Sequence, residues 1–407
     1  MNTQRFSDLI KENSGMDGRG HAVVIGGSLA GLLAARVLAD HFDRVTVIER
    51  DQLPLEPASR KGVPQARHLH VLLARGRLIL EEMFPGIMQE LAEASAPMAD
   101  MAADVKWLTP AGWGVRFKSN IGILPTSRDL LEFRVRRRVS AIPGIYFIDE
   151  CDVTGLTSNA ARDRITGLRL NLRTRPHWDT ERFNNLQADL VVDAGGRGSK
   201  TPKWLEELGY APPEETVINA FLGYASRIYR QPESRRDWQG LYVQAAPPAH
   251  TRGGVLFPIE GNRWLLTIVG LGRDYPPTDE AGFLEFARSM RTPIIYDAIK
   301  DAEPLSDIYT YRATENRVRH YEHLTRRPEG LIVMGDAACA FNPVYGQGMT
   351  TAALGAETLR ECIEHQRARH AGDLTGIEAR FQKRLAKANS AAWMLATGED
   401  LRVPQVV

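Results

Sequence analysis

The chain has 407 residues, of which 43% are hydrophobic and 25% charged, as in ordinary globular proteins. Its length predicts two or three domains, or one domain that carries a large insertion. The formal net charge is +1 and the isoelectric point is about 7.8, so composition excludes the strongly basic surface typical of a nucleic-acid-binding protein.

No segment indicates export or membrane insertion. Residues 1–20 are polar, lack the apolar core of a signal peptide, and predict a flexible N-terminal tail. No uninterrupted apolar run approaches the ~20 residues of a transmembrane helix. The three cysteines, Cys151, Cys339 and Cys362, lie far apart and form neither a disulfide framework nor a metal pattern. We therefore expect a cytoplasmic protein.

Residues 22–51 contain a complete β–α–β unit. A β-branched run predicts a buried strand at 22–25, apolar spacing predicts a helix at 29–40, and a second strand is predicted at 44–48. A Gly-rich turn joins the first strand to the helix and directs backbone N–H groups and the positive helix end to one point, which suits a pyrophosphate. The turn consists of Gly26, Gly27, Ser28, Leu29, Ala30 and Gly31. Ser28 replaces the middle glycine, and its small side chain could donate to a phosphate.

An acidic residue and three arginines extend this dinucleotide site. Glu49 lies at the end of the second strand, where a carboxylate can accept hydrogen bonds from the ribose hydroxyls. Arg50 follows Glu49. Arg60 lies in the loop 52–65, and the N–H groups of its planar guanidinium suit phosphate oxygens. A solvated charge in a surface loop explains this arginine equally well. Arg128 opens a helix capped by Ser127, where a cation opposes the helix dipole. A pyrophosphate beside Arg128 would explain its position.

The segment Arg67-His68-Leu69-His70 contains two histidines before a stretch at 71–83 that is predicted to be helical. Two imidazoles are too few for even a catalytic zinc site, and no other Cys or His cluster accompanies them. We therefore expect no metal. One imidazole is expected to hydrogen-bond near the cofactor and the other to be structural.

The middle of the chain is rich in strands. A hairpin at 105–117 and strands at 144–155, 164–173 and 217–229, with others up to residue 269, predict an inserted antiparallel sheet. Six aromatic residues of this block could line a substrate pocket or could equally belong to the sheet core. They are Trp107, Trp113, Tyr224, Tyr242, Phe257 and Trp264.

Two further Gly-rich turns follow apolar runs. A strand at 186–192 leads into Asp193 and Gly195, and a strand at 331–334 leads into Asp336. The loop that then approaches a helix contains Pro343, Gly346, Gln347, Gly348 and Met349. This second helix N-terminus can stabilise another developing anion. The last helix, with a capping box at Thr375 and Glu378, is expected only to pack.

Three separated motifs together resemble the FAD-dependent monooxygenases of the aromatic-hydroxylase type. They are the 26–31 turn with Glu49, the DAGGRGS run at 193–199, and the 335–349 loop. Residues 62–70 resemble a signature of the bacterial branch that includes polyether-polyene epoxidases and squalene-epoxidase relatives. The resemblance extends from about residue 22 to 360; Ser28 departs from it, and relatives of that branch usually continue beyond the point where this chain stops.

The resemblance implies an α/β fold, with a Rossmann-like FAD-binding domain, an inserted antiparallel β-sheet substrate domain and C-terminal helices. The expected FAD-binding domain is discontinuous, over residues 21–100, 120–210 and 305–365. The substrate domain would take 101–119 and 211–304, and a C-terminal helical segment 366–407.

The resemblance also implies roles for single residues. Gly26, Ser28 and Gly31 would carry the dinucleotide turn, Glu49 the ribose and Arg128 the phosphate side of FAD. Asp193 and Gly195 belong to a motif that such enzymes use for both FAD and the nicotinamide cofactor. Asp336 would hold a ribityl or phosphate-side oxygen. The flavin-edge loop would place Pro343, Gly346, Gln347, Gly348 and Met349 along the isoalloxazine.

The expected activity is FAD-dependent monooxygenation, in which NAD(P)H and O₂ serve to epoxidise or hydroxylate an apolar or aromatic small molecule of secondary metabolism. No side chain needs to be a nucleophile, and a base for phenol hydroxylation is not evident. A halogenase would share the fold, but the WxWxIP stretch of such enzymes is missing. A flavin-dependent reductase or dehydrogenase of a lipid-like substrate would share these motifs, and a non-enzymatic prenyl-binding carrier would share the fold. Oligomeric state and the need for a separate flavin reductase stay open.

Overall fold

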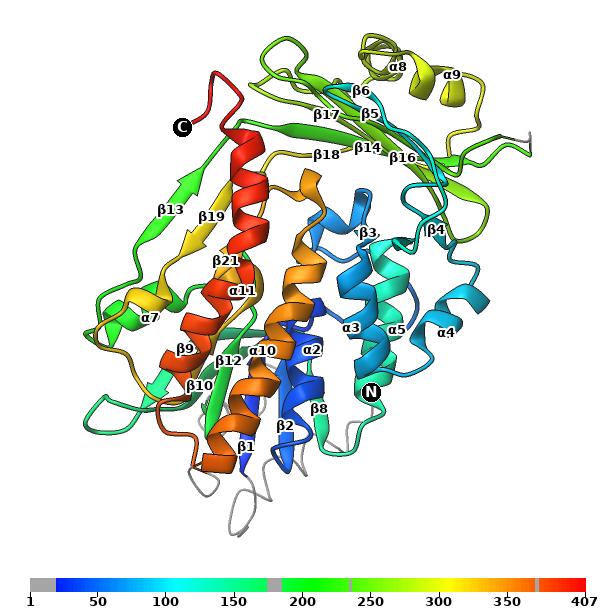
Figure 1. Ribbon diagram of the computed structural model, residues 1–407. Helices are drawn as coiled ribbons and strands as arrows, with labels where there is room; N and C mark the ends of the chain where they lie inside the picture. The colour runs from blue at the N-terminus through cyan, green and yellow to red at the C-terminus, as the bar shows by residue number, and fades with distance from the viewer. Residues whose placement is uncertain (1–19, 174–184, 234–235, 370–372) are drawn as a thin grey trace.

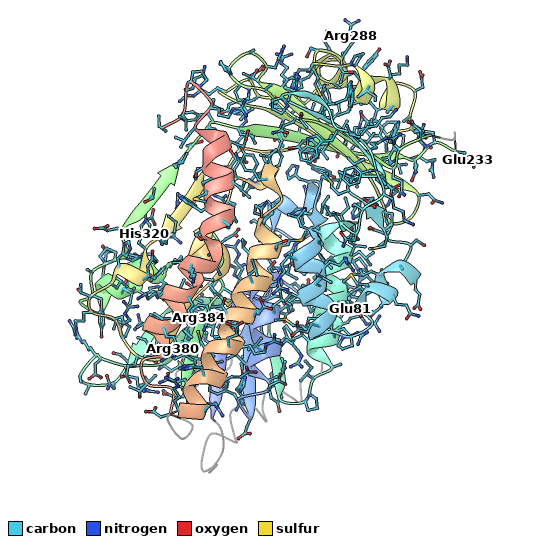
Figure 2. The ribbon with its side chains drawn as sticks, in the orientation of Figure 1. Glu81, Glu233, Arg288, His320, Arg380 and Arg384 are labelled. Atoms are coloured by element: carbon cyan, nitrogen blue, oxygen red, sulfur yellow. The ribbon has the colours of Figure 1, made fainter. Side chains whose placement is uncertain are left out.

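The computed structural model describes residues 20–173, 185–233, 236–369 and 373–407. Almost all of the predicted N-terminal tail, residues 1–20, therefore lies outside the described residues. Among the described helices, none is long and apolar enough to cross a bilayer. Arg288, an exposed residue, points away from the molecule at its upper edge (Figure 2).

A five-stranded parallel sheet lies at the centre of the lower half of the molecule in Figure 1. Its strand order is β20-β12-β1-β2-β8. The strands span Leu331–Val333 (β20), Leu190–Asp193 (β12), His21–Ile25 (β1), Arg44–Ile48 (β2) and Ile145–Ile148 (β8). They are apolar and mostly buried, as a parallel sheet covered on its faces requires. The predicted β–α–β unit is confirmed as β1, α2 and β2.

Helices cover the face of this sheet that is turned to the viewer in Figure 1. The long helices α10 and α11 pack against each other, and α10 also packs on α2 and α3. The helices of this half are α2 (Leu29–Leu38), α3 (Ala74–Met83), α4 (Ile87–Glu93), α5 (Arg128–Ser140), α7 (Thr201–Glu207), α10 (Gly348–Arg369) and α11 (Ile377–Asp400). As predicted, Ser127 caps α5, and its side chain accepts a hydrogen bond from the Leu130 amide.

Smaller sheets and turns extend this half. One sheet has the order β11-β10-β9, another β13-β19-β21, and the short strand β7 pairs with β3 and β4. The strands are Val71–Leu72 (β3), Ala99–Asp100 (β4), Gly122–Pro125 (β7), Cys151–Ser158 (β9), Ile165–Leu172 (β10), Asn185–Gln187 (β11), Glu215–Ile218 (β13), Asn316–Arg319 (β19) and Cys339–Ala340 (β21). The 3-10 turns are Pro64–Arg67 (η1), Tyr321–His323 (η2), Gly335–Ala337 (η3) and Pro343–Tyr345 (η4).

A seven-stranded sheet lies across the top of the molecule in Figure 1, in the order β18-β14-β17-β16-β15-β5-β6. Its strands are Val105–Thr109 (β5), Gly112–Trp113 (β6), Gly223–Arg230 (β14), Gly240–Val243 (β15), Arg252–Ile259 (β16), Arg263–Gly270 (β17) and Tyr309–Tyr311 (β18). Helices α8 (Glu280–Arg288) and α9 (Ile294–Ile299) cover its outer face. Because side chains alternate along a strand, Leu266 and Ile268 pack under these helices while Thr267 and Val269 face the other way.

The structure corrects several predicted elements. The single strand expected at 144–155 is β8 and β9, which Glu150 separates with a φ of 52°, and the strand at 217–229 is β13 and β14, separated near Phe221 with a φ of 46°. The strand at 186–192 is likewise divided into β11 and β12. The upper sheet is mixed, because β15 and β5 run parallel. The capping box was also wrong: Gly376 precedes α11, and the Glu378 side chain accepts from the Gly330 amide.

Candidate functional site

A cavity of about 630 Å³ lies where the carboxyl ends of β1, β2, β12 and β20 face the inner side of the seven-stranded sheet. The carboxyl edge of a parallel sheet is the usual place for a ligand in such folds. The cavity has two chemically different ends. We call the part beside the 26–31 turn the dinucleotide end and the part beneath the seven-stranded sheet the substrate end.

At the dinucleotide end, two glycines are required by close backbone packing. A Cβ on Gly31 would lie 1.8 Å from the Gly26 carbonyl oxygen, which the first turn of α2 brings against the end of β1. Gly26 itself has a φ of 100°, and a Cβ there would lie 2.6 Å from the Ala194 carbonyl oxygen. Both glycines therefore let strand, helix and neighbouring turn approach closely, as the predicted dinucleotide turn needs.

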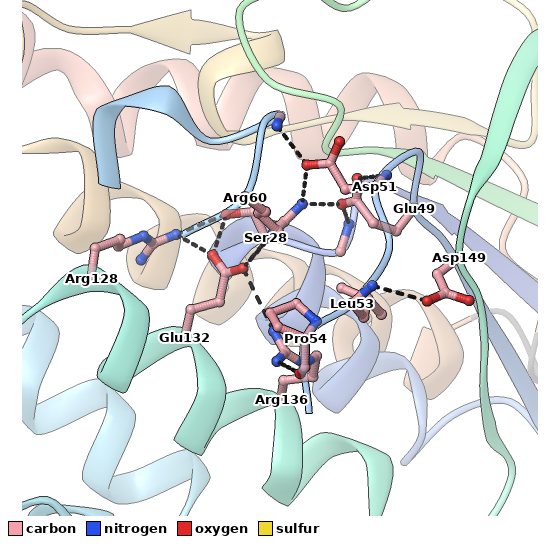
Figure 3. A network of polar contacts seen from close by, with 12 residues as sticks. Ser28, Glu49, Asp51, Leu53, Pro54, Arg60, Arg128, Glu132, Arg136 and Asp149 are labelled. Atoms are coloured by element: carbon pink, nitrogen blue, oxygen red, sulfur yellow. Dashed lines mark hydrogen bonds and ion pairs between the residues drawn. The ribbon is translucent and has the colours of Figure 1, made fainter. Parts of the chain in front are cut away.

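Buried charges support this turn, with Glu132 of α5 at their centre (Figure 3). The Ser28 hydroxyl donates to Glu132 Oε2 at 2.7 Å, and Arg128 Nη2 donates to the same oxygen at 3.0 Å and to Ser28 Oγ at 2.8 Å. Burial would raise the pKa of Glu132, but Arg128, Arg60 and the Ser28 hydrogen bond outweigh burial and lower it. The hydroxyl of Ser28 is thus bonded within the protein, rather than free to donate to a phosphate as the sequence suggested.

Arg60 is part of the same network. Its Nε and Nη2 donate to Glu132 Oε1 at 2.9 and 2.8 Å, and its Nη1 lies 2.9 Å from Glu49 Oε2 and 3.3 Å from Asp51 Oδ2. Burial alone would lower the pKa of Arg60, but these carboxylates outweigh burial and raise it. All three guanidinium nitrogens therefore have carboxylate partners, which argues against Arg60 as the phosphate ligand.

Arg128 fits that role better. It lines the cavity and is only 6% exposed, yet its Nη1 is buried and has no hydrogen-bond partner among the described residues. Burial lowers the pKa of Arg128 despite the nearby Glu132. A buried guanidinium nitrogen without an acceptor is costly, and an anionic oxygen would satisfy it.

Glu49 and Arg50 both line the cavity at the end of β2. Glu49 Oε2 accepts from the Gly27 amide at 2.8 Å, and Oε1 accepts from the Asp51 amide at 3.0 Å. Arg50 donates to the Gly62 carbonyl at 3.2 Å. Glu49 Oε2 also contacts Arg60, whereas Oε1 has one partner among the described residues, the Asp51 amide, and keeps acceptor capacity, so the ribose contact stays a prediction that the geometry allows.

Asp193 ends β12, and Asp336 lies in the turn η3 that follows β20; both line the same cavity. Asp193 holds its own turn: Oδ1 accepts from the Gly195 amide at 2.8 Å, and Oδ2 accepts from the Ser199 and Thr201 hydroxyls. Burial raises the pKa of the Asp336 carboxyl, although Arg197 and Arg128 act in the other direction. Asp193 shapes the wall, whereas Asp336 is the acid more available to a ligand.

The flavin-edge loop 343–349 borders the cavity and leads into α10. Gly346 has a φ of 65°, and a Cβ on either Gly346 or Gly348 would meet no atom within 4 Å. Each Cβ would therefore point into open space along the cavity wall. Val344 of the loop packs with Tyr224 and Val269 of the upper sheet, so the loop connects the two ends of the cavity.

The C-terminal helix does more than pack. Asp400, at the end of α11, accepts from the Tyr345 hydroxyl at 2.6 Å and from Asn342 Nδ2 at 3.1 Å, which anchors the flavin-edge loop. Leu395 and Glu399 of the same helix line the cavity. Sequence reasoning missed these residues because a polar residue near a helix end has no local signal for a tertiary contact.

Aromatic rings dominate the substrate end. Four of the six predicted wall residues, Trp107, Tyr224, Tyr242 and Phe257, line the cavity. Trp107 stacks on Tyr242 with ring centroids 5.3 Å apart. The other two do not: Trp264 is 1% exposed in the sheet core beneath α8 and α9, which is the alternative that the sequence left open, and Trp113 is 50% exposed on the hairpin. Strand alternation explains why Trp264 belongs to the core, because it places this side chain on the face opposite the cavity.

The two histidines of the segment between η1 and β3 also line the cavity. Burial lowers the pKa of His68 to about 3 and that of His70 to about 4. His70 donates from Nδ1 to the His68 carbonyl at 2.9 Å. Among the described residues, the group with metal-ligand spacing consists of His320, Glu322 and His323, at η2, so His68 and His70 belong to no such cluster.

Comparisons with known proteins fit this architecture. No protein-family model matches the chain. It is 34% identical over 385 residues to Protein Rv3254 of Mycobacterium tuberculosis, which is 94% of this chain and 80% of that protein. It is 26% identical to kynurenine 3-monooxygenase of Salinispora arenicola, over 85% of this chain and 72% of that protein.

The fold has solved counterparts. The crystal structure of PqsL, a probable FAD-dependent monooxygenase from Pseudomonas aeruginosa, matches with a TM-score of 0.69 and 16% identity, over 94% of this chain and 96% of that chain. This likeness confirms the predicted fold class, while the narrower resemblance to polyene and squalene epoxidases stays a prediction. The chain belongs to the same family as Protein Rv3254, and its fold is that of the FAD-dependent monooxygenases.

Proposed function

We propose that this chain is an FAD-dependent monooxygenase that uses NAD(P)H and O₂ to hydroxylate or epoxidise an apolar or aromatic small molecule. One observation carries the proposal: a single cavity joins an anion-binding end, where Arg128 Nη1 lacks a partner among the described residues, to an aromatic substrate end, with the flavin-edge loop between them. The fold and the relatives support the same function. No observation on the described residues favours a flavin-free carrier of the same fold.

The residues present fit FAD. The N-terminus of α2 and the buried Arg128 offer donors for a pyrophosphate, and Glu49 offers an acceptor for a ribose. Asp336 is available to a ribityl or phosphate-side oxygen. The Gly346–Gly348 stretch leaves open space, where a flat ring could approach the backbone. Leu29, Ala30 and Met349 also border the cavity.

Bound FAD would supply the redox chemistry between NAD(P)H, O₂ and substrate. The chain's own groups would position and shield these reactants. Backbone N–H groups at the start of α10, from Gly348 onward, are placed to stabilise negative charge on a neighbouring ring. The aromatic walls of the substrate end would hold an apolar substrate and exclude water. In this proposal the discontinuous domain of residues 21–100, 120–210 and 305–365 binds FAD, and the upper sheet binds the substrate.

The test begins with the purified protein. We expect a flavin absorption spectrum and release of FAD on denaturation. NAD(P)H oxidation should consume O₂ when alkenes and phenols are supplied, and its rate without an added reductase shows whether a separate flavin reductase is needed. A protein that stays colourless after reconstitution with FAD would overturn the proposal. Flavin reduction without substrate-dependent O₂ uptake would favour a reductase or dehydrogenase.

A further inference from the structure

A chain of hydroxyl groups fixes His68 at the substrate end. His68 is 3% exposed, and its Nδ1 lies 2.8 Å from Ser226 Oγ. Ser226 Oγ lies 2.6 Å from Thr267 Oγ1, which accepts from the Leu69 amide at 3.0 Å. Ser226 and Thr267 are direct register partners on β14 and β17. The neighbouring strands thus place two hydroxyls where they can orient one imidazole.

Aromatic contacts fix the ring from a second side. The His68 ring meets Tyr224 edge-on, with centroids 4.6 Å apart, and lies 5.7 Å from Tyr311. With Nδ1 bonded to Ser226, Nε2 is the nitrogen that has no hydrogen-bond partner among the described residues. Since His68 lines the cavity, Nε2 is the atom it can offer to a ligand.

The imidazole offers this atom without charge, because burial holds the pKa of His68 near 3, with His70 and Arg67 acting in the same direction. A neutral imidazole has one N–H and one acceptor nitrogen. The Ser226 hydroxyl can donate to Nδ1 or accept from it, so Nε2 can be either donor or acceptor. A hydroxyl on the ligand matches both forms, since it can also donate and accept, whereas an ether oxygen only accepts.

The cavity-lining cation that acts on the rings around His68 is already paired with protein groups. The cations that line the cavity are Arg50, Arg60, Arg128, Arg197 and Lys200. Of these, Arg197 is the one whose charge reaches Tyr224 and Tyr311. Its guanidinium donates to the carbonyls of Glu315 and Phe341 and pairs with the Glu315 carboxylate. Glu399 adds an acidic group to the same cavity. A carboxylate ligand would be desolvated here without a counter-ion.

We propose that His68 is a specificity-determining residue and that the site takes uncharged aromatic molecules that carry a hydroxyl group, which Nε2 of His68 hydrogen-bonds. This inference rests on the proposed function, because it names the substrate class of the same cavity. It favours phenol-like molecules over carboxylates of similar size and over aromatic ligands that lack a hydroxyl.

Three probes of one ring size test the proposal: 2-naphthol, 2-methoxynaphthalene and 2-naphthoate. Their dissociation constants are measured by equilibrium dialysis against the purified protein. The FAD-loaded form is used if the protein binds FAD. We expect 2-naphthol to bind about tenfold more tightly than 2-methoxynaphthalene, as one net hydrogen bond predicts, and 2-naphthoate to bind most weakly. Equal affinities for 2-naphthol and its methyl ether, tighter binding of 2-naphthoate, or no binding of 2-naphthol would overturn the proposal.

Variants assign the preference to His68. His68→Leu keeps apolar bulk, and the affinity ratio of 2-naphthol to 2-methoxynaphthalene should fall to about one, as the loss of one net hydrogen bond predicts. Should this variant fail to fold, Ser226→Ala keeps the imidazole but removes its orienting hydroxyl, and the ratio should fall in the same direction. Thr310→Ala is the matched control, since Thr310 is exposed on β18 beside the strand of Ser226, and it should keep the parent ratio.

The outcomes separate this inference from the proposed function. A folded His68→Leu variant that retains flavin and the parent ratio overturns the role of His68 alone. A parent protein that binds no FAD overturns the proposed function, while the probe ratio of the apoprotein still decides the inference.

Discussion

The dinucleotide end of the cavity is lined by buried charged side chains, whereas the substrate end is lined by aromatic and uncharged polar side chains. At the first, Glu132, Arg60 and Arg128 are buried together, with side chains no more than 7% exposed. At the second, stacked rings and hydroxyl groups surround a neutral imidazole. The first end is suited to an anionic ligand of fixed shape, whereas the second is suited to apolar contact and one hydrogen bond.

This difference makes the two ends depend on different forces. Buried ions are costly unless every partner is present, so the dinucleotide end should be sensitive to loss of a single charge. Apolar contacts and neutral hydrogen bonds are individually weaker, so substitutions at the substrate end should act more on ligand choice than on folding. The following changes test that contrast, from the largest expected effect to the smallest.

Replacing Glu132 with glutamine should give the largest effect. The change removes the charge shared by Arg60 and Arg128, which leaves buried guanidinium groups undercompensated. We expect the free energy of unfolding, measured with urea, to fall by about 3–5 kcal/mol. Glu56→Gln, at an exposed loop position, is the control and should change it little. A loss below about 1 kcal/mol would show that the charge of Glu132 contributes little to the stability of the fold.

Arg128→Met tests the anion-binding role. The side chain keeps most of its length but loses the Nη1 that lacks a partner among the described residues. A lost charge-assisted hydrogen bond is worth about 1.5–3 kcal/mol, so FAD affinity should fall about tenfold to a hundredfold. Arg137→Met, on the exposed side of the same helix, should bind FAD like the parent. Equal FAD affinity in both variants would remove Arg128 from the phosphate site.

The neutral histidine should make stability depend on pH. His68 has a pKa of about 3 in the folded chain, below the ordinary value of 6.5, so the unfolded chain takes up the proton first. Its contribution to stability is complete above pH 6.5 and is lost as the pH falls from 6.5 towards 3. In His68→Leu, the slope of unfolding free energy against pH in this window should fall by up to about 1.4 kcal/mol per pH unit. Urea titrations at a series of pH values measure it, and an unchanged slope contradicts the burial of a neutral imidazole.

Gly348→Ala should have the smallest and most selective effect. The added methyl group meets no protein atom within 4 Å, so the apoprotein should unfold with unchanged or slightly higher free energy, by about 0.5–1 kcal/mol at most. FAD should nevertheless bind more weakly, because the methyl group enters the space along the flavin-edge loop. Gly398→Ala in α11 is matched, since its Cβ also meets nothing; FAD affinity should be unaffected there. Equal FAD affinity in both variants would show that the isoalloxazine ring does not lie against the flavin-edge loop.

The sequence was informative wherever a function depends on local backbone geometry. The β–α–β unit, the glycines at 26 and 31, the Ser127 cap and the turns after β12 and β20 were all found from spacing and residue type. Each of these features lies within a few residues, so sequence order and spatial order coincide. The candidate cofactor residues Glu49, Arg128 and Asp336 were located by the same signals and do line one cavity.

Only the tertiary structure decided which side chains share a partner. Glu132 joins Ser28 to Arg60 across 104 and 72 residues of sequence, and the carboxylate partners of Arg60 argue against its predicted role as a phosphate ligand. Ser226 and Thr267 meet because β14 and β17 pair in one register, and Asp400 reaches the flavin-edge loop because α11 ends beside it. Burial then sets the charge of each group, and burial is a property of the packed chain rather than of any segment. The sequence by itself therefore located the strands and turns that line the cavity, while packing determined the charges and the walls of the cavity and the hydrogen-bond partners of His68.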